Sequence, residues 1–327
     1  MTTTAATGAQ TGRGATAGAL HRRGALLTLI LANILWAGTY TAGKVALRYL
    51  SPVELNTIRF SLAALMLSPV LVRGWRRLPR DRRSLLMLAF LTLLGFVLNK
   101  TFEYVGLSLS TASDVALLIA TESIFTALLS WTLLRERVTA AGVVALLVGL
   151  FGVYLIIERG FAPNLGGGGG AARIVGDLLV VLSLLIEALY TVKGKSTLAA
   201  VPPLLFIATT ITGGLLVWLP AGAIAVAHSG WPHVPMQGWL AVLYMAGFAT
   251  VAGYYLWFRG LSVVDGSVAA PLLFIQPLLG ATLAILLLHD VVTWATLLGG
   301  ALIGASLLLV MRGARSSSVT PVPEPTP

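Results

Sequence analysis

Long apolar runs recur along the chain and constrain its fold more than any other feature. Leu85–Leu98 and Leu278–Leu288 are two of them. Of the 327 residues, 57% are hydrophobic and only 10% are charged, whereas a soluble domain carries about 25% charged residues. A membrane-spanning helix needs roughly 20 apolar residues, while a membrane β-barrel would show alternating segments of about 10. The sequence therefore predicts an all-α integral membrane protein.

The apolar runs divide into ten spans of helix length. Prolines, glycines and charged residues separate them, among them Ser51-Pro52, the run Gly166–Gly170 and Pro202-Pro203. Each span is close to the roughly 20 residues that cross a bilayer. We expect transmembrane helices at residues 26–47, 52–72, 84–106, 112–134, 138–157, 174–192, 203–227, 237–258, 266–288 and 291–311.

Basic residues orient these spans, because loops rich in Lys and Arg stay on the cytoplasmic side of a membrane. With the N-terminus inside, sixteen of the 22 basic residues fall on the inner side. The outer side then holds Arg48, Arg159 and Arg173. We therefore expect both termini in the cytoplasm and an even number of helices.

Several classes of site are disfavoured by composition. The net charge of +10 lies mainly in short loops between helices, so we expect no nucleic-acid partner. The chain has no cysteine, which excludes disulfides and thiolate metal sites. His228 and His233 have no carboxylate beside them, so we expect no metal site. There is no Walker loop, so ATP is not the expected energy source and no cofactor is expected.

The chain also contains a weak internal repeat. Residues 36–52 (WAGTYTAGKVALRYLSP) align with residues 187–203 (EALYTVKGKSTLAAVPP) at an offset of 151. Residues 135–139 align with 289–293 at an offset of 154. Each copy holds five expected helices, so the second copy enters the membrane from the opposite side. Inverted repeats are common in secondary transporters, with the substrate site near the midplane; a chance match is the alternative.

Several short motifs in this order resemble the EamA family of the drug/metabolite transporter (DMT) superfamily, over roughly residues 26–312. Arg135 departs from the Gly-Glu-Arg turn usual in the family, and Ser123 stands where a proline is common, although Pro277 keeps that proline in the second half. The motifs are Trp36-Ala37-Gly38, Lys44, Pro52, Arg59-Phe60, Thr121-Glu122, Phe125–Leu134 and Arg135-Glu136-Arg137-Val138-Thr139.

The resemblance implies ten transmembrane helices, arranged as two inverted five-helix EamA repeats around a central cavity. It also implies a bacterial inner-membrane protein that exports metabolites such as amino acids, or that takes up or effluxes related small solutes. The oligomeric state stays open, and a homodimer is allowed. The expected organisation is a cytoplasmic tail at 1–23, a first repeat at 24–160, a Gly-rich linker at 161–172, a second repeat at 173–312 and a tail at 313–327.

Polar residues inside the spans are candidates for the substrate site. Exposing a charged side chain to the bilayer core is costly, so such residues are expected to face the interior of the bundle. In helix 1, Asn33, Trp36 and Tyr40 share one helical face. In helix 3, Lys100 and Glu103 are three residues apart and Asn99 lies beside them. This patch can grip a zwitterion, or it can be a self-neutralising pair. We select Asn33, Trp36, Tyr40, Asn99, Lys100, Glu103, Glu122, Glu187, Tyr190 and Gln276 as substrate-binding candidates.

The carboxylates carry two interpretations. Glu122, central in helix 4, is either a substrate or proton site or a structural partner of the equally deep Arg59. Glu187, with Tyr190 beside it, either faces the cavity or pairs with Lys193 or Lys195 at the interface. Burial favours the neutral form of a carboxylic acid, so such a group can load and release protons.

Other features of the second half bear on the cavity and the scaffold. Tyr254 can stack on a solute, whereas Tyr255 and Trp257 fit an aromatic belt at the membrane interface. Gln276-Pro277 interrupts helix 9 in mid-membrane and can open its backbone to the cavity. Small residues four apart predict close helix packing, namely Ala145 with Gly149 and Gly300 with Gly304.

The function that these observations favour is a secondary transporter rather than an enzyme. The alternatives are efflux of cationic compounds, and a non-transport membrane protein such as a lipid scramblase. A membrane enzyme would need a nucleophile, base or metal cluster at one membrane face, and the sequence offers none. The expected partners are a small-molecule substrate and the lipid bilayer.

Overall fold

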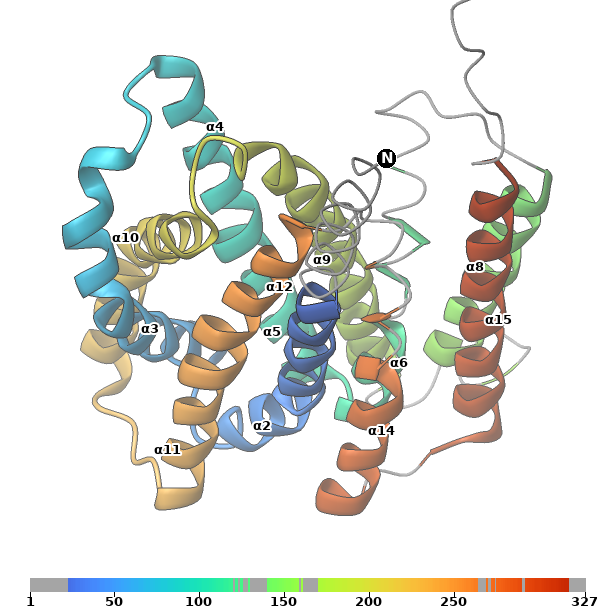
Figure 1. Ribbon diagram of the computed structural model, residues 1–327. Helices are drawn as coiled ribbons and strands as arrows, with labels where there is room; N and C mark the ends of the chain where they lie inside the picture. Colours follow the sequence, from blue (N-terminus) through green and yellow to red (C-terminus); the bar gives the residue numbers. More distant parts are fainter. Residues whose placement is uncertain are drawn as a thin grey trace, which may run out of the picture.

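The computed structural model describes residues 23–119, 121–122, 124–125, 129, 140–158, 160, 170–263, 269, 272–273, 275–289 and 292–317. All regular elements within these residues are helical, and they form a bundle (Figure 1). Six of the described helices are long and apolar enough to cross a membrane: Arg23–Ala46, Pro52–Arg77, Arg82–Leu109, Gly170–Thr197, Pro203–Ser229 and Met236–Leu261.

These six helices coincide with the expected spans 1, 2, 3, 6, 7 and 8, and each runs slightly beyond them. Several consist of more than one element. The first includes α2 (Thr39–Ala46), and the second joins α3 (Pro52–Gly74) to η1 (Trp75–Arg77). The others are α4 (Arg82–Thr92), η2 (Leu93–Leu98) and α5 (Asn99–Leu109); α9 (Gly170–Thr197); α10 (Pro203–Ser229); and α11 (Met236–Leu243), η3 (Tyr244–Gly253) and α12 (Tyr254–Leu261).

The remaining described helices belong to the expected spans 4, 5, 9 and 10. They are α6 (Ala112–Leu118), α8 (Ala140–Glu158), α14 (Ile275–Leu288) and α15 (Trp294–Ser317). Much of the expected helix 112–134 lies outside the described residues, so the tenfold count stays a prediction. Two bounds differ from expectation: α9 begins at Gly170, within the expected linker, and α15 extends into the expected C-terminal tail.

The outside of the bundle is apolar and its inside is partly polar. Many large apolar side chains are exposed, among them Leu65, Val72 and Leu216 at 70%, 71% and 73%. Buried polar side chains include Asn33, Arg59 and Asp177. A soluble protein would bury the first group and expose the second, so this distribution suits a lipid environment.

Helices α3 and α10 pack along one another and carry matching prolines. Pro52 and Pro203 each occupy the first turn, and Pro69 and Pro220 each lie inside the helix. Both pairs are separated by 151 residues, the offset seen in the sequence repeat. The Ser51 side chain caps α3 in a capping box with Glu54. Across the pair, the Thr57 hydroxyl donates to the Trp218 carbonyl at 2.9 Å.

Two helices of the bundle contain a π-helical segment at equivalent places. The segment η2 begins at Leu93 and η3 begins at Tyr244, again 151 residues apart. Such wide turns leave backbone carbonyls without their usual partners. Indole N–H groups from other helices bind two of them: Trp218 donates to Phe96 O at 2.6 Å, and Trp36 donates to Ala249 O at 2.8 Å.

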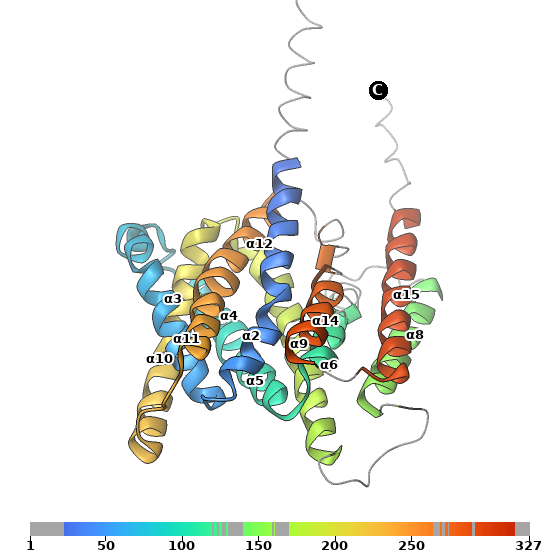
Figure 2. The same ribbon diagram turned by 90° about the horizontal axis from the view of Figure 1, so that it is seen from below.

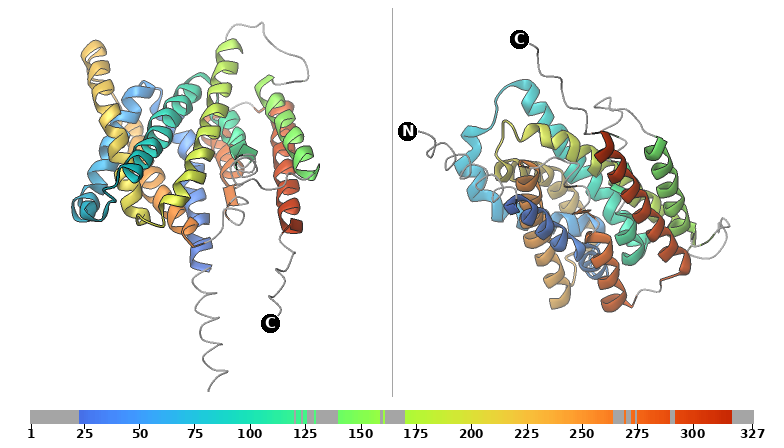
Figure 3. Two further views of the ribbon diagram at one scale, coloured as in Figure 1. Left: turned by 90° about the horizontal axis from the view of Figure 1, so that it is seen from above. Right: turned by 45° about the vertical axis from the view of Figure 1, so that its right-hand side comes forward.

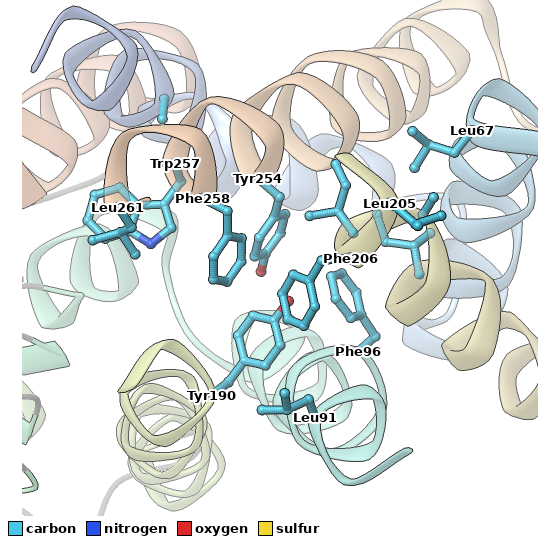
Figure 4. Close-up of a cluster of buried hydrophobic side chains, with 14 of the residues drawn as sticks. Leu67, Leu91, Phe96, Tyr190, Leu205, Phe206, Tyr254, Trp257, Phe258 and Leu261 are labelled. Atoms are coloured by element: carbon cyan, nitrogen blue, oxygen red, sulfur yellow. The ribbon is translucent and has the colours of Figure 1, made fainter. Parts of the chain in front are cut away.

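Aromatic rings fill the interior next to these segments. Figure 4 shows Tyr190, Phe206 and Phe258 converging from α9, α10 and α12. Phe206 and Phe258 have ring centroids 4.9 Å apart, and Phe96 and Tyr254 are 5.2 Å apart. Each such pair contributes about 0.5–1.5 kcal/mol beyond the area it buries. The cluster fixes how the second half packs onto the first.

Helices α8 and α15 form a pair at one side of the bundle (Figures 1–3). They touch at Gly152 and Gly299, where an added Cβ on either residue would lie 2.6 Å from the backbone oxygen of the other. Of the small residues predicted to pack closely, Gly149 of α8 also meets α15, with 2.8 Å from an added Cβ to the Ser306 hydroxyl oxygen. Gly300 faces Leu117 instead, with 3.2 Å from an added Cβ to the leucine methyl group.

Candidate functional site

A polar cavity lies inside the bundle, between helices of the two halves of the chain. Its volume is about 40 Å³, which is room for about three water molecules. Aromatic, amide and charged side chains dominate its wall. They are Trp36, Thr39, Tyr40, Arg59, Asn99, Lys100, Glu103, Ile119, Glu122, Leu184, Glu187, Thr191, Tyr254, Trp257 and Gln276.

The structure brings eight of the ten candidate residues to this cavity: Trp36, Tyr40, Asn99, Lys100, Glu103, Glu122, Glu187 and Gln276. They come from four separate helical spans and from the start of α14. Their role in binding a solute stays a prediction, whereas their location around one cavity is a feature of the structure. Spacing along single helices could not show this convergence, because it arises from tertiary packing.

Two candidates do not line the cavity. Asn33 is fully buried behind the wall, where its side-chain oxygen accepts a hydrogen bond of 2.8 Å from the Gln276 amide. Its own amide donates to Leu29 O at 2.7 Å. Tyr190 belongs to the aromatic cluster, with its ring stacked on Phe206 at 6.0 Å. Both residues support the wall from outside.

An ionic contact joins the two halves across the cavity. The Lys100 ammonium on α5 lies 2.5 Å from the Glu103 carboxylate and 3.7 Å from the Glu187 carboxylate on α9. Tyr254 also donates weakly to Glu187, at 3.4 Å. The predicted pairing of Glu187 with Lys193 or Lys195 is thus replaced by a contact with Lys100, because Glu187 points into the bundle rather than to its edge.

Arg59 is held by neutral groups. Its Nε donates to the Thr250 hydroxyl at 2.6 Å, and its Nη1 donates to the Tyr104 hydroxyl at 2.5 Å. The guanidinium also lies over the rings of Phe60 and Tyr104, at 5.5 and 5.3 Å from their centroids. No ion pair joins Arg59 to Glu122, so of the two interpretations of Glu122 the structural pair with Arg59 is not formed.

Glu122 reaches the cavity from the chain that follows α6. The residue is 6% exposed, and among the described residues its carboxylate has no hydrogen-bond or ion-pair partner. The charged side chains of Glu187, Lys100 and Glu103 line the same cavity. A carboxylate in such a place is expected to bind a proton or a cation, because an unpaired buried charge is costly.

Sequence reasoning missed part of the wall. Trp257 is only 3% exposed and contacts Trp36 at a centroid distance of 5.5 Å, so its assignment to an interfacial belt is wrong. It lies three residues after Tyr254, on the same face of α12, and this spacing was the available signal. Thr39 and Thr191 carry the same signal, since they lie three residues after Trp36 and four residues after Glu187. Gln276 and Pro277 lie in the first turn of α14 and do not interrupt a described helix.

A second polar cluster lies beyond the cavity, at the end of the bundle where α5 ends and α9 begins. Arg173 contacts Asp177 at 2.6 Å and Asp114 at 3.7 Å. The Ser110 hydroxyl donates to Asp177, and the Lys44 ammonium donates to the backbone carbonyls of Leu107, Ser108 and Ser110. We call Lys44, Ser110, Asp114, Arg173 and Asp177 the end cluster.

The end cluster is displaced from the cavity along each helix that lines it. Ser110 follows Glu103 by seven residues, and Asp177 precedes Leu184 by seven, which is roughly 10 Å at 1.5 Å per residue. Lys44 follows Tyr40 by four residues in the same direction. The cluster therefore lies between the cavity and that end of the bundle, and it ties the first half of the chain to the second.

Apolar spanning helices with a polar cavity between them define a polytopic membrane protein with an interior site. The chain belongs to the EamA-like transporter family, whose model matches residues 23–158 and 174–312. This membership confirms the resemblance found in the sequence. It also places the protein in a family of transporters.

Two relatives of this chain are also described as transporters. An uncharacterized transporter of Archaeoglobus fulgidus is 25% identical over 290 residues, which cover 88% of this chain and 98% of the relative. The uncharacterized transporter YvbV of Bacillus subtilis is 27% identical over 297 residues, covering 88% and 91%. Neither name states a solute.

One solved structure shares the fold. It is described only as a crystal structure of a protein, and it matches with a TM-score of 0.63 at 22% identity. The match covers 90% of this chain and 98% of the other. At this identity the likeness concerns the helical architecture alone.

Proposed function

We propose that the protein is a secondary transporter of the bacterial inner membrane that exports a small metabolite, such as an amino acid, by alternating access. The carrying observation is the polar cavity, whose wall is shared by both segments that match the family. Lys100 and Glu103 come from the first segment and Glu187 from the second. A site shared in this way changes shape when the two halves move against each other.

The proposal includes ten helices in two inverted repeats, with both termini in the cytoplasm. Equivalent features 151 residues apart support the repeat. They are the first-turn prolines Pro52 and Pro203, the internal prolines Pro69 and Pro220, and the starts of η2 and η3 at Leu93 and Tyr244. Kinks and wide turns at matching places are expected when two copies share one architecture.

Alternating access fits the size of the cavity. A space for about three water molecules does not hold an amino acid, so loading requires the surrounding helices to separate. The end cluster supports a state in which that end of the bundle is held together. Opening there would break the contacts of Arg173 with Asp177 and Asp114.

Proton coupling through Glu122 is part of the proposal. Three glutamates face the cavity beside two basic residues, and Glu122 is the carboxylate without a partner among the described residues. Neutralising it with a proton removes the cost of an unpaired charge in a water-poor site. A proton taken up on one side can then be exchanged for a solute.

The test is solute flux in proteoliposomes of purified protein, with and without an imposed pH gradient. Labelled amino acids and organic cations form the panel. We expect saturable flux that responds to the gradient, and loss of the response in Glu122→Gln. Glu54→Gln is the matched control, because Glu54 lies in the capping box of α3, where Gln also fits.

The outcomes separate the parts of the proposal. Saturable flux in Glu122→Gln with an unchanged pH response would reject Glu122 as the coupling site. If the folded protein transports no solute of the panel, the transporter proposal is rejected and the lipid scramblase alternative is favoured. Lipid-flipping assays on the same vesicles would detect scramblase activity.

A further inference from the structure

The ammonium group of Lys100 marks a place in the cavity that suits a cation. It lies 2.5 Å from Glu103 and 3.7 Å from Glu187, and 5.7 Å above the ring centroid of Tyr254. Carboxylates and the face of an aromatic ring both stabilise a positive charge, more strongly when water is excluded. The wall therefore already binds one ammonium, which belongs to the chain itself.

The carboxylates around this place outnumber the basic groups that contact them, so a second cation can be bound there. Glu103, Glu122 and Glu187 face the cavity, and of the two basic groups only Lys100 contacts a carboxylate of a described residue. Arg59 is committed to Thr250 and Tyr104 instead. Buried carboxylates in excess of their partners favour the entry of a positive group or of protons.

Unpartnered polar atoms point to a ligand that donates hydrogen bonds. Within the part of the chain that the structure describes, the Asn99 side-chain oxygen, the Thr39 hydroxyl and Oε2 of Glu187 are buried without a hydrogen-bond partner. All three residues line the cavity. Asn99 is 1% exposed and Thr39 is 5% exposed. Two of these atoms only accept hydrogen bonds and the third can accept, so an N–H-bearing cation satisfies them where an anion does not.

Aromatic side chains complete the enclosure. Trp36, Tyr40, Tyr254 and Trp257 line the same cavity, and Trp36 contacts Tyr254 at a centroid distance of 5.2 Å. Ring faces attract ammonium groups and also accept the apolar part of a solute. The wall thus offers an acceptor-rich end and an aromatic side.

Lys100 is suited to give way to a solute. Its ammonium is carried by a flexible four-carbon stem, and its contact with Glu187 is long enough at 3.7 Å to be replaced by a closer donor. A bound amine can take over Glu187 while Lys100 keeps Glu103. The amine then binds without breaking the ion pair between Lys100 and Glu103.

Building on the proposed transport function, we infer that the cavity recognises the protonated amine of its solute, and that the Lys100 ammonium holds this place when no solute is bound. The amine donates to Glu187, Asn99 and Thr39. The carboxylate of an amino acid is not required for recognition, so primary amines without one are ligands too.

The first test compares three solutes that share a phenylethyl skeleton and differ in their charged groups: phenylalanine carries an ammonium and a carboxylate, phenethylamine an ammonium alone and 3-phenylpropionate a carboxylate alone. Binding to purified full-length protein is measured from the rise of the unfolding midpoint with solute concentration. We expect phenethylamine to bind and 3-phenylpropionate to bind about tenfold more weakly or not at all, since one charge-assisted hydrogen bond has that value.

A variant pair assigns the effect to the cavity. Glu187→Gln is expected to weaken phenethylamine binding by about tenfold, whereas Glu54→Gln leaves it unchanged. Absence of phenethylamine binding, or 3-phenylpropionate binding at least as tight, would overturn the inference. Saturable flux of an anionic solute in proteoliposomes would also overturn the inference about amine recognition, but it would support the proposal that the protein is a transporter. Failure of the inference and failure of the proposed function are therefore distinguishable.

The second test asks whether a free amine can replace Lys100. Lys100→Ala removes the atoms of propylamine from the side chain, so propylammonium chloride should raise the unfolding midpoint of this variant. Sodium chloride and sodium propionate at the same concentration should not. Lys193→Ala, outside the cavity wall, should show no such specific rise. An equal rise with sodium chloride would show that Lys100 does not hold a cation site; if the variant does not fold, the solute comparison decides alone.

Discussion

Buried charges in this protein are stabilised by different partners; spacing along the chain indicated the Lys100–Glu103 contact but not the partners of Arg59 or Glu187. Arg59 uses two hydroxyl groups and two aromatic rings, whereas Lys100 uses two carboxylates. The planar guanidinium needs donors aimed at fixed angles, while an ammonium acts as a point charge. The two residues are therefore expected to respond differently to substitution.

Arg59→Lys keeps the charge but cannot reach Thr250 and Tyr104 with the same geometry. We expect a loss of about 1–3 kcal/mol in stability, the cost of leaving a buried polar group without its partner. The unfolding midpoint of detergent-purified protein measures it. Arg48→Lys, at an exposed position, should be neutral; an unshifted midpoint in Arg59→Lys would show that the hydroxyl contacts contribute nothing.

Asp81 provides a pH-dependent contact outside the spanning segments. Its carboxylate accepts a hydrogen bond of 2.9 Å from the Ser84 backbone N–H at the start of α4. This bond holds the pKa of Asp81 below its ordinary value of 3.8. A lowered pKa means that the stabilisation is present above the ordinary pKa and is lost as pH falls through the folded-state value.

We therefore expect protection of the Ser84 amide from hydrogen exchange to fall in acid. Asp81→Asn should remove this pH dependence, because asparagine also caps helices and does not titrate in this range. Identical acid profiles for both proteins would contradict the assignment.

Helix packing in this bundle depends on close backbone approach at a few positions. Gly152 of α8 and Gly299 of α15 face one another with no space for a side chain. The small-residue pattern predicted close packing at Gly300, which approaches Leu117 of α6, whereas the contact with α8 is made by the neighbouring Gly299. Adjacent glycines are equivalent in the sequence, and only the rotation of α15 about its axis decides which one enters the contact.

Gly299→Leu is expected to force α8 and α15 apart, with a loss of about 1–3 kcal/mol typical of overpacking. The readout is the yield of monodisperse protein and its unfolding midpoint. Gly24→Leu is the matched control, since an added Cβ at Gly24 meets no atom within 4 Å. Equal behaviour of the two variants would argue against a close α8–α15 contact.

At the scale of the whole molecule, the cavity and the end cluster lie along the same helices. The cluster joins residues 44, 110 and 114 of the first half to 173 and 177 of the second. Asp177 is fully buried, and its carboxylate is shared between Arg173 and Ser110. A buried ionic contact of this kind restrains the relative movement that alternating access requires.

Asp177→Asn is expected to loosen that end of the bundle and to lower stability by about 3–5 kcal/mol, as for other broken buried pairs. Access is measured by thiol labelling, which is specific because the native chain has no cysteine. A Thr39→Cys reporter in the cavity wall should react faster in the Asp177→Asn background. Asp81→Asn is the control background, and equal labelling rates would show that the cluster does not restrict access.

The sequence by itself determined the membrane environment, the helical class, the family and most of the cavity-lining residues. The reason is physical: lipid tolerates neither exposed polar backbone nor stray charge, so apolar length reveals the spans and polar exceptions reveal the interior.

Only the tertiary structure decided which groups most of the buried polar side chains contact. Arg59 does not pair with Glu122, Glu187 contacts Lys100, Trp257 lines the cavity and Tyr190 does not. These relations depend on the rotation and depth of each helix against its neighbours. Residues up to 243 positions apart meet, as Asn33 and Gln276 do, and no local pattern encodes that contact.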